Sequence, residues 1–330
     1  MSTPTHTIAQ RLYYDSPVLE FAARITDIRL VEKDPNATPD TSQLWQVALD
    51  RTAFYPEGGG QPWDTGLLIA TAPSGTTLEI PVERVYEDEA GEVWHSVRKP
   101  LVEGTEITGA VDPARRTDHE QQHSGQHLLS AVFLRELNAR TVSFHLGAES
   151  STIDLALPEG TDRISDEDLR LVEESANRII YENRPLLTHW VERPLAEAML
   201  ARGDLRKLPP LEGPFRIVQM QGIEFNACGG THVRSTGEIG AILLRRIEKV
   251  RQGWRVEFVC GLRAVRSARA DYTLLDTVAR TLTISRTDVP TRVEKLLEDR
   301  KASAKEVKKL TQELAKHAPS ASAGTHSPER

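Results

Sequence analysis

Apolar and polar residues alternate in short segments over the first third of the chain, as in strands that bury one face. Two such segments are 44–49 and 78–85. Residues 53–66 hold four glycines and two prolines, which exclude a regular helix or central strand. An ordered loop or bulged hairpin is expected there, either to cradle phosphate or RNA backbone or as a tight turn under Trp63. A mostly β domain is therefore predicted over 1–110.

Helical and strand patterns mix in the middle of the chain. Over 121–138, apolar side chains recur at helical spacing, which predicts a first helix. Ser165 starts a second helix, with acidic residues in its first turn. Pro194 opens a third helix, which should stop near Gly203. Strands are expected over 215–219, 241–247 and 254–259.

The last part of the chain has the pattern of two helices. Apolar positions mark one helix over 274–282 and another over 293–314, with a turn between them. The second stripe has nearly heptad spacing, but Arg300 interrupts it, which favours an antiparallel helical hairpin over a long zipper. We predict a hairpin over 263–317. The Ser-, Ala- and Pro-rich tail 318–330 is expected to be disordered.

Two short motifs combine residues that bind metal ions. In His123-Ser-Gly-Gln-His127, the two imidazoles are four positions apart and lie on one face of a helix. The motif Cys228-Gly-Gly-Thr-His232 adds a thiolate and a third imidazole, and its glycines let the backbone turn tightly. Together they make a Cys-His₃ set, which selects zinc. We predict one zinc ion held by these four side chains.

The number of ligands leaves the role of the zinc open. Four protein ligands are typical of a closed structural site, whereas catalytic zinc keeps one position for water. A catalytic role requires one loose ligand or a fifth coordination position. The pattern is not that of a zinc protease, because Ser124 replaces the general-base glutamate. The HxE and PCxxC pattern of zinc deaminases is also absent from the sequence.

Composition and charge indicate the class of protein, its location and its possible partners. Of the 330 residues, 39% are apolar and 27% are charged, as in an ordinary globular protein, and no secretory signal or membrane-spanning run is apparent, so a cytoplasmic location is expected. Two cysteines do not make a disulfide framework. The net charge of −7 does not suggest nucleic acid, but residues 245–269 carry eight basic and two acidic side chains. Arg245 and Arg246 are candidate tRNA-binding residues, and a solvated surface is the alternative.

Three sequence runs resemble a known family. They are Phe54–Pro62, Arg115–Phe133 and Ala227–Gly240. Together they resemble the editing domain shared by alanyl- and threonyl-tRNA synthetases, in the arrangement of the freestanding AlaX-type alanyl-tRNA editing proteins. The resemblance covers about residues 10–315. It implies an α+β protein, with an N-terminal β-barrel followed by an α/β zinc-containing editing domain over 111–262.

The resemblance also implies a function. It points to hydrolysis of the ester that links serine to alanine tRNA, with glycine as a second candidate amino acid and with zinc at the four positions above. No ATP-dependent synthetase core precedes the motifs, so the chain is expected not to charge tRNA. ATP binding is expected only because the family is described in general as ATP-binding. Thr141, Ser143 and His145 are candidates for contacting the serine hydroxyl, or else form an ordinary strand. A non-catalytic tRNA-binding module with structural zinc and an editor of threonine tRNA remain alternatives.

Overall fold

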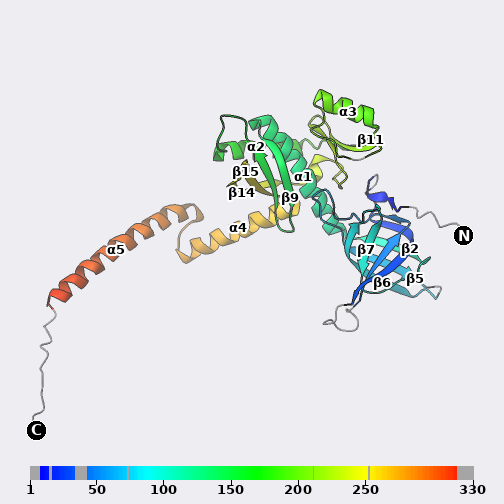
Figure 1. The fold of residues 1–330 in the computed structure, drawn as a ribbon. Helices are drawn as coiled ribbons and strands as arrows, with labels where there is room; N and C mark the ends of the chain where they lie inside the picture. Colours follow the sequence, from blue (N-terminus) through cyan, green and yellow to red (C-terminus); the bar gives the residue numbers. More distant parts are fainter. Residues whose placement is uncertain are drawn as a thin grey trace, which may run out of the picture. The chain divides into compact units, whose positions relative to one another are not determined.

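The computed structural model describes residues 8–14, 17–33, 43–72, 74–210, 212–251 and 253–317. The chain divides into two units, Met1–Val265 and Arg266–Arg330. The first contains a closed β-barrel, a two-stranded sheet and two larger sheets with helices, and the second is helical (Figure 1). The predicted mixture of helices and strands, with a β-barrel near the N-terminus, is confirmed.

Six strands close the barrel in the order β2-β3-β7-β6-β5-β8, and all neighbours are antiparallel. Along β6, Ile80 and Val82 face the interior, and a register shift between Val82 and Arg84 then turns Val85 inward. A short parallel pair, β1 and β4, and the 3₁₀ turn η1 accompany the barrel. The elements are β1 (Gln10–Arg11), η1 (Leu12–Tyr14), β2 (Glu20–Lys33), β3 (Gln43–Leu49), β4 (Arg51–Thr52), β5 (Gly66–Thr71), β6 (Thr77–Glu87), β7 (Val93–Val97) and β8 (Glu106–Val111).

Helix α1 (Pro113–Leu137) follows the barrel directly. The Asp112 carboxylate accepts hydrogen bonds from two backbone N–H groups of the first turn, which caps the helix. The helix therefore begins eight residues before the predicted start at Gln121. The apolar pattern could not show this, because several polar side chains of these early turns are themselves buried, Arg116 and His119 among them.

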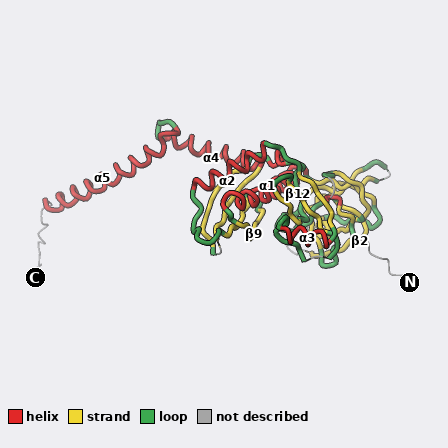
Figure 2. Tube along the Cα trace, turned by 90° about the horizontal axis from the view of Figure 1, so that it is seen from above, coloured by secondary structure: helices red, strands yellow, loops and turns green. Residues whose placement is uncertain are grey.

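A four-stranded antiparallel sheet, in the order β14-β15-β10-β9, lies beside α1 and α2 (Figure 2). Leu129 and Phe133 of α1 share one core with Val172 of α2 and with Ile153 and Phe258 of the sheet. As predicted, Ser165 begins α2, where it forms a capping box. The elements are β9 (Arg140–Leu146), β10 (Ser151–Ala156), α2 (Asp166–Tyr181), β14 (Ile242–Val250) and β15 (Gly253–Cys260).

A third sheet, in the order β11-β12-β13, packs with helix α3 through Ala196, Met199 and Ile217. The predicted third helix is confirmed, and it ends at Gly203, whose φ of 82° is a left-handed conformation that glycine adopts without strain. The elements are β11 (Leu186–Val191), α3 (Arg193–Arg202), β12 (Phe215–Met220), β13 (Glu224–Ala227) and the 3₁₀ turn η2 (Thr236–Ile239).

Buried polar contacts join the barrel to α1. The Arg116 guanidinium, 2% exposed, forms an ion pair with Asp64, which is fully buried in the loop before β5. Arg116 Nη2 also donates to Ala53 O at 2.6 Å, and Arg115 Nε donates to Trp63 O at 2.9 Å. The glycine-rich loop is thereby held against the helix that carries the first metal motif. The division into domains at residue 110 stays a prediction.

Two helices form the C-terminal part, α4 (Gly261–Thr281) and α5 (Val289–His317), with the 3₁₀ turn η3 (Arg286–Asp288) between them. Their apolar stripes are exposed, with Leu274 at 68% and Leu310 at 50%. The two helices are confirmed, but the packing of a hairpin is not. No helix in the described residues is long and apolar enough to cross a membrane. The predicted disordered tail, 318–330, lies outside the described residues.

Candidate metal centre

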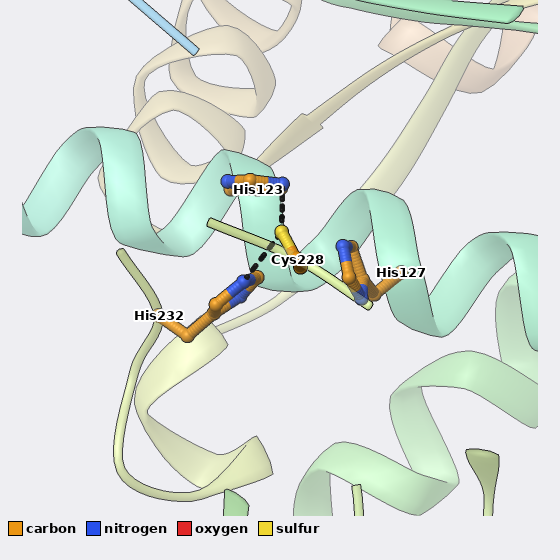
Figure 3. A group of neighbouring side chains, drawn as sticks. All are labelled: His123, His127, Cys228 and His232. Atoms are coloured by element: carbon orange, nitrogen blue, oxygen red, sulfur yellow. Dashed lines mark hydrogen bonds between the residues drawn. The ribbon is translucent and has the colours of Figure 1, made fainter. Parts of the chain in front are cut away.

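The four predicted ligands come together in one cluster. Helix α1 places His123 and His127 one turn apart, Cys228 follows β13, and His232 lies in the loop before η2. One nitrogen or sulfur atom from each side chain lies within 4.8 Å of all the others. Cys228 Sγ is 3.4 Å from His123 Nε2 and 3.3 Å from His232 Nε2 (Figure 3). Two segments about a hundred residues apart therefore supply one Cys-His₃ donor set.

The protonation chemistry of this cluster fits a metal ion. Burial lowers the pKa of His123 and His232 well below the usual value, and that of His127 to about 3. The imidazoles are therefore neutral at pH 7, each with one nitrogen lone pair. Burial raises the pKa of the Cys228 thiol, and a bound cation would favour the thiolate instead. Neutral imidazoles and one thiol in this arrangement suit zinc.

Each imidazole also contacts a polar side chain through Nδ1. Such partners fix the ring orientation of metal-binding histidines, and an acceptor at Nδ1 also fixes the tautomer that leaves Nε2 free. The contacts are Gln61 Oε1 with His123 Nδ1 at 2.8 Å, Asn226 Nδ2 with His127 Nδ1 at 3.0 Å, and Ser124 Oγ with His232 Nδ1 at 3.2 Å. Ser124, at the position of the general-base glutamate of a zinc protease, therefore contacts one of the four candidate ligands.

The Cys-Gly-Gly-Thr-His loop is shaped by a glycine and a buried arginine. A Cβ atom on Gly230 would lie 2.2 Å from His123 Cε1, so that position accepts no side chain without movement of the ring. The neighbouring Gly229 has open space, with Tyr14 Oη 3.8 Å away. Arg216 Nη1 donates to the carbonyl oxygens of Cys228 and Gly230, both at 2.8 Å. These contacts fix the path of the loop past His123.

The glycine-rich stretch is the ordered loop that the sequence predicts. Gly59 and Gly60 have φ values of 58° and 84°, and Gly58 and Gln61 bridge the turn. A Cβ atom on Gly60 would lie 2.6 Å from the Phe144 ring, so the loop approaches β9 closely. The Phe144 ring is also 6.1 Å from the His123 ring, centroid to centroid. The glycine-rich loop, the Phe144 ring and the cluster of four candidate ligands therefore lie next to one another.

Comparisons with known protein families match two separate parts of the chain. The family described as "Threonyl and Alanyl tRNA synthetase second additional domain" matches residues 215–256, which include Cys228 and His232. The family described as "tRNA synthetases class II (A)" matches residues 3–115, which include the barrel. The resemblance to these synthetase domains is confirmed.

Relatives of the chain carry related names. It is 35% identical over 315 residues to an alanine–tRNA ligase of Pyrococcus furiosus, covering 92% of this chain and 32% of the ligase. A ligase of Pyrococcus abyssi is 34% identical over the same length. The alanyl-tRNA editing protein AlaX-L of Pyrococcus horikoshii is 34% identical over 264 residues, covering 78% of this chain and 59% of AlaX-L. The chain thus spans about a third of the ligases and three fifths of AlaX-L.

The predicted substrate residues lie on β9 in different settings. Thr141 Oγ1 donates to Ser130 Oγ of α1 at 2.8 Å. Ser143 Oγ donates to Asp154 Oδ2 of the neighbouring strand at 2.7 Å, and both Ser143 and His145 are exposed. Thr141 is therefore the candidate that contacts the helix carrying His123 and His127, and a substrate role for all three residues stays a prediction.

Part of the basic stretch 245–269 is neutralised in the fold. Arg255 and Arg263 each form an ion pair with an aspartate of another element, and Arg263 is 8% exposed. Arg245 and Arg246 lie on β14, and Arg246 Nη2 is 2.9 Å from a carboxylate oxygen of Glu248. The segment is therefore less basic in the fold than its sequence indicates. Contact of Arg245 and Arg246 with tRNA stays a prediction.

Several residues of the site were not predicted. They are Gln61, Asn226, Phe144 and Arg216. Gln61 directly follows the three glycines of the loop, and Asn226 is two positions before Cys228, so their nearness to a motif was an available signal. Nothing local in the sequence marks Arg216, whose contacts depend on the pairing of β12 with β13.

Proposed function

We propose that the chain hydrolyses the ester bond between a wrongly attached amino acid and alanine tRNA. Serine is the first substrate we propose, and glycine the second. Zinc held by His123, His127, Cys228 and His232 is the proposed cofactor. The observation that carries the proposal is the convergence of these four donors within 4.8 Å, in a chain whose relatives include an alanyl-tRNA editing protein. Such an activity on tRNA belongs in the cytoplasm.

The chemistry would divide between metal and protein. Bound zinc supplies Lewis acidity, which polarises an ester carbonyl or lowers the pKa of a water molecule. Gln61, Asn226 and Ser124 hold the imidazoles in place, and Arg216 holds the loop that carries Cys228. Phe144 presents an aromatic face next to His123. A preorganised site of this kind needs little rearrangement when the substrate arrives.

Discrimination between serine and alanine is the physical reason for a separate hydrolytic site. The two amino acids differ by one hydroxyl, and an apolar pocket rejects such an analogue poorly. A site that hydrogen-bonds the hydroxyl selects serine instead. We propose Thr141 as the first of the three β9 candidates to test, because its hydroxyl lies against α1. Arg245 and Arg246 are proposed to contact the tRNA backbone.

Two alternatives are tested by the same experiment. The matched family includes threonyl-tRNA synthetases, so a mischarged threonine tRNA is an alternative substrate. A non-catalytic tRNA-binding module with structural zinc is the other, because four protein ligands are typical of structural sites. Release of the amino acid from Ser-tRNA(Ala), Gly-tRNA(Ala), Ala-tRNA(Ala) and Ser-tRNA(Thr), measured side by side, separates these functions.

The two cysteines provide a matched pair of variants for this experiment. Cys228→Ala removes the thiolate ligand, whereas Cys260→Ala removes a buried thiol that packs against Gly125 of α1. We expect Cys228→Ala to lose zinc and Ser-tRNA(Ala) deacylation, and Cys260→Ala to keep both at some cost in melting temperature. A zinc-free, folded Cys228→Ala protein with full deacylation would overturn the catalytic role of the metal. Wild-type protein that binds tRNA and zinc but releases no amino acid would support the structural alternative.

A further inference from the structure

Gln61 connects the glycine-rich loop of the barrel to the cluster of four candidate metal ligands. Its side chain is 1% exposed, and Oε1 lies 2.8 Å from His123 Nδ1. The same oxygen accepts the backbone N–H of Thr231 at 3.0 Å, and Nε2 donates to Thr231 Oγ1 at 2.8 Å. One amide from the glycine-rich loop therefore contacts both metal motifs, at His123 in the first and at Thr231 in the second.

These contacts determine the tautomer of His123. The Thr231 N–H can only donate, so it requires the oxygen of the Gln61 amide at that position. That same oxygen faces His123 Nδ1, which must then carry the proton. A neutral imidazole has one N–H, so Nε2 keeps its lone pair. Nε2 is the nitrogen that lies 3.4 Å from Cys228 Sγ, on the side of the other donors.

The loop that carries Gln61 is held in place on both sides. Gly60 has a positive φ and approaches the Phe144 ring too closely for a side chain. Asp64, three positions after Gln61, is fully buried in its ion pair with Arg116 of α1. The barrel therefore presents Gln61 to His123 from a fixed backbone.

We infer that Gln61 is a positioning residue that orients His123 for metal binding, so that the affinity for zinc depends on the barrel as well as on the four ligands. The inference rests on the proposed zinc site. Removal of an equivalent hydrogen-bond partner from a metal-binding histidine typically weakens metal binding about 10- to 100-fold. Deacylation would fall with the bound metal.

Three variants separate this role from simple docking of the loop. Gln61→Met keeps the approximate size but removes the acceptor for His123. Gln61→Glu keeps an acceptor for His123 and for the Thr231 N–H, and the Thr231 hydroxyl can turn to donate to it. Thr231→Val removes a contact of Gln61 with the loop but leaves its contact with His123. The readouts are the zinc dissociation constant by chelator competition, the visible spectrum of the cobalt-substituted protein, and the melting temperature.

We expect Gln61→Met to weaken zinc binding about 10- to 100-fold and to alter the cobalt spectrum, with Gln61→Glu and Thr231→Val within about threefold of wild type. If Gln61→Met does not fold, Gln61→Asn replaces it in the experiment. Its side chain is one methylene too short to reach His123, so the same weakening of zinc binding is expected. Unchanged affinity in Gln61→Met, or equal weakening in Gln61→Met and Thr231→Val, would overturn the role of Gln61. Absence of zinc binding in the wild type would instead overturn the metal centre itself.

Discussion

A single methyl group at Gly230 should disrupt the metal centre. The Cβ atom of an alanine there would lie 2.2 Å from His123 Cε1, 2.4 Å from Nδ1 and 2.9 Å from Gln61 Oε1. Non-bonded carbon atoms prefer a separation of about 3.5–4.0 Å, so the imidazole would have to move by more than about 1 Å. Zinc–ligand distances vary by only about 0.2 Å, so a displaced His123 ring could no longer bind the ion.

The matched control is the preceding glycine. On Gly229, a Cβ atom would meet Tyr14 Oη at 3.8 Å, an ordinary contact, in the same loop of the chain. We expect Gly230→Ala to lower the zinc affinity at least as much as loss of a supporting contact does, by about 100-fold, and to cost about 1–3 kcal/mol of stability from overpacking. Gly229→Ala should keep the wild-type affinity.

Chelator competition on the two purified variants measures these affinities, and thermal melting with and without zinc measures the stability. A folded Gly230→Ala protein that binds zinc as tightly as Gly229→Ala would refute the reasoning, because it would show that His123 does not need its observed position. Equal loss of zinc in both variants would also contradict it. In that case the loop as a whole, and not the contact with His123, would control binding.

Two further predictions concern the barrel and the tRNA. Burial lowers the pKa of His95 to about 4. Between pH 6.5 and 4, the imidazole is therefore protonated in the unfolded chain but neutral in the folded barrel. About 3 kcal/mol of folding stability should be lost as the pH falls through this range. Denaturant unfolding should show a flatter pH dependence for His95→Gln, and an unchanged slope would contradict this. Replacing Arg245 and Arg246 with alanine should weaken tRNA binding and reduce its salt dependence, as measured by filter binding at several salt concentrations. Unchanged binding curves would show that the two arginines are solvated surface residues that do not contact tRNA.

Local signals in the sequence were sufficient for much of the fold. The capping residue Ser165 and the glycine at 203 marked helix ends that the structure confirms. The spacing of His123 and His127 was sufficient to place both on one face of a helix, because that geometry depends on a single element. The early turns of α1 were missed, because Arg116 is buried there by an ion pair with a distant residue and not by apolar packing.

Long-range contacts account for what the sequence could not show. Gln61 and His123 are 62 positions apart, and Asn226 and His127 are 99 apart. Amide side chains are common in loops, so neither Gln61 nor Asn226 stands out before the fold brings it to a histidine. Ser143 was a candidate for substrate contact in the sequence, but in the fold its hydroxyl donates a hydrogen bond to Asp154 of the adjacent strand.

The most direct test of the proposed activity is release of serine from Ser-tRNA(Ala) by the purified chain, before and after removal of its metal. Zinc-loaded protein should release serine and leave Ala-tRNA(Ala) intact. A chelator should abolish the release, and added zinc should restore it, because the proposed reaction depends on an ion held by the four clustered donors. Folded, zinc-loaded protein that leaves Ser-tRNA(Ala) intact, or metal-free protein that deacylates it at the full rate, would contradict the account.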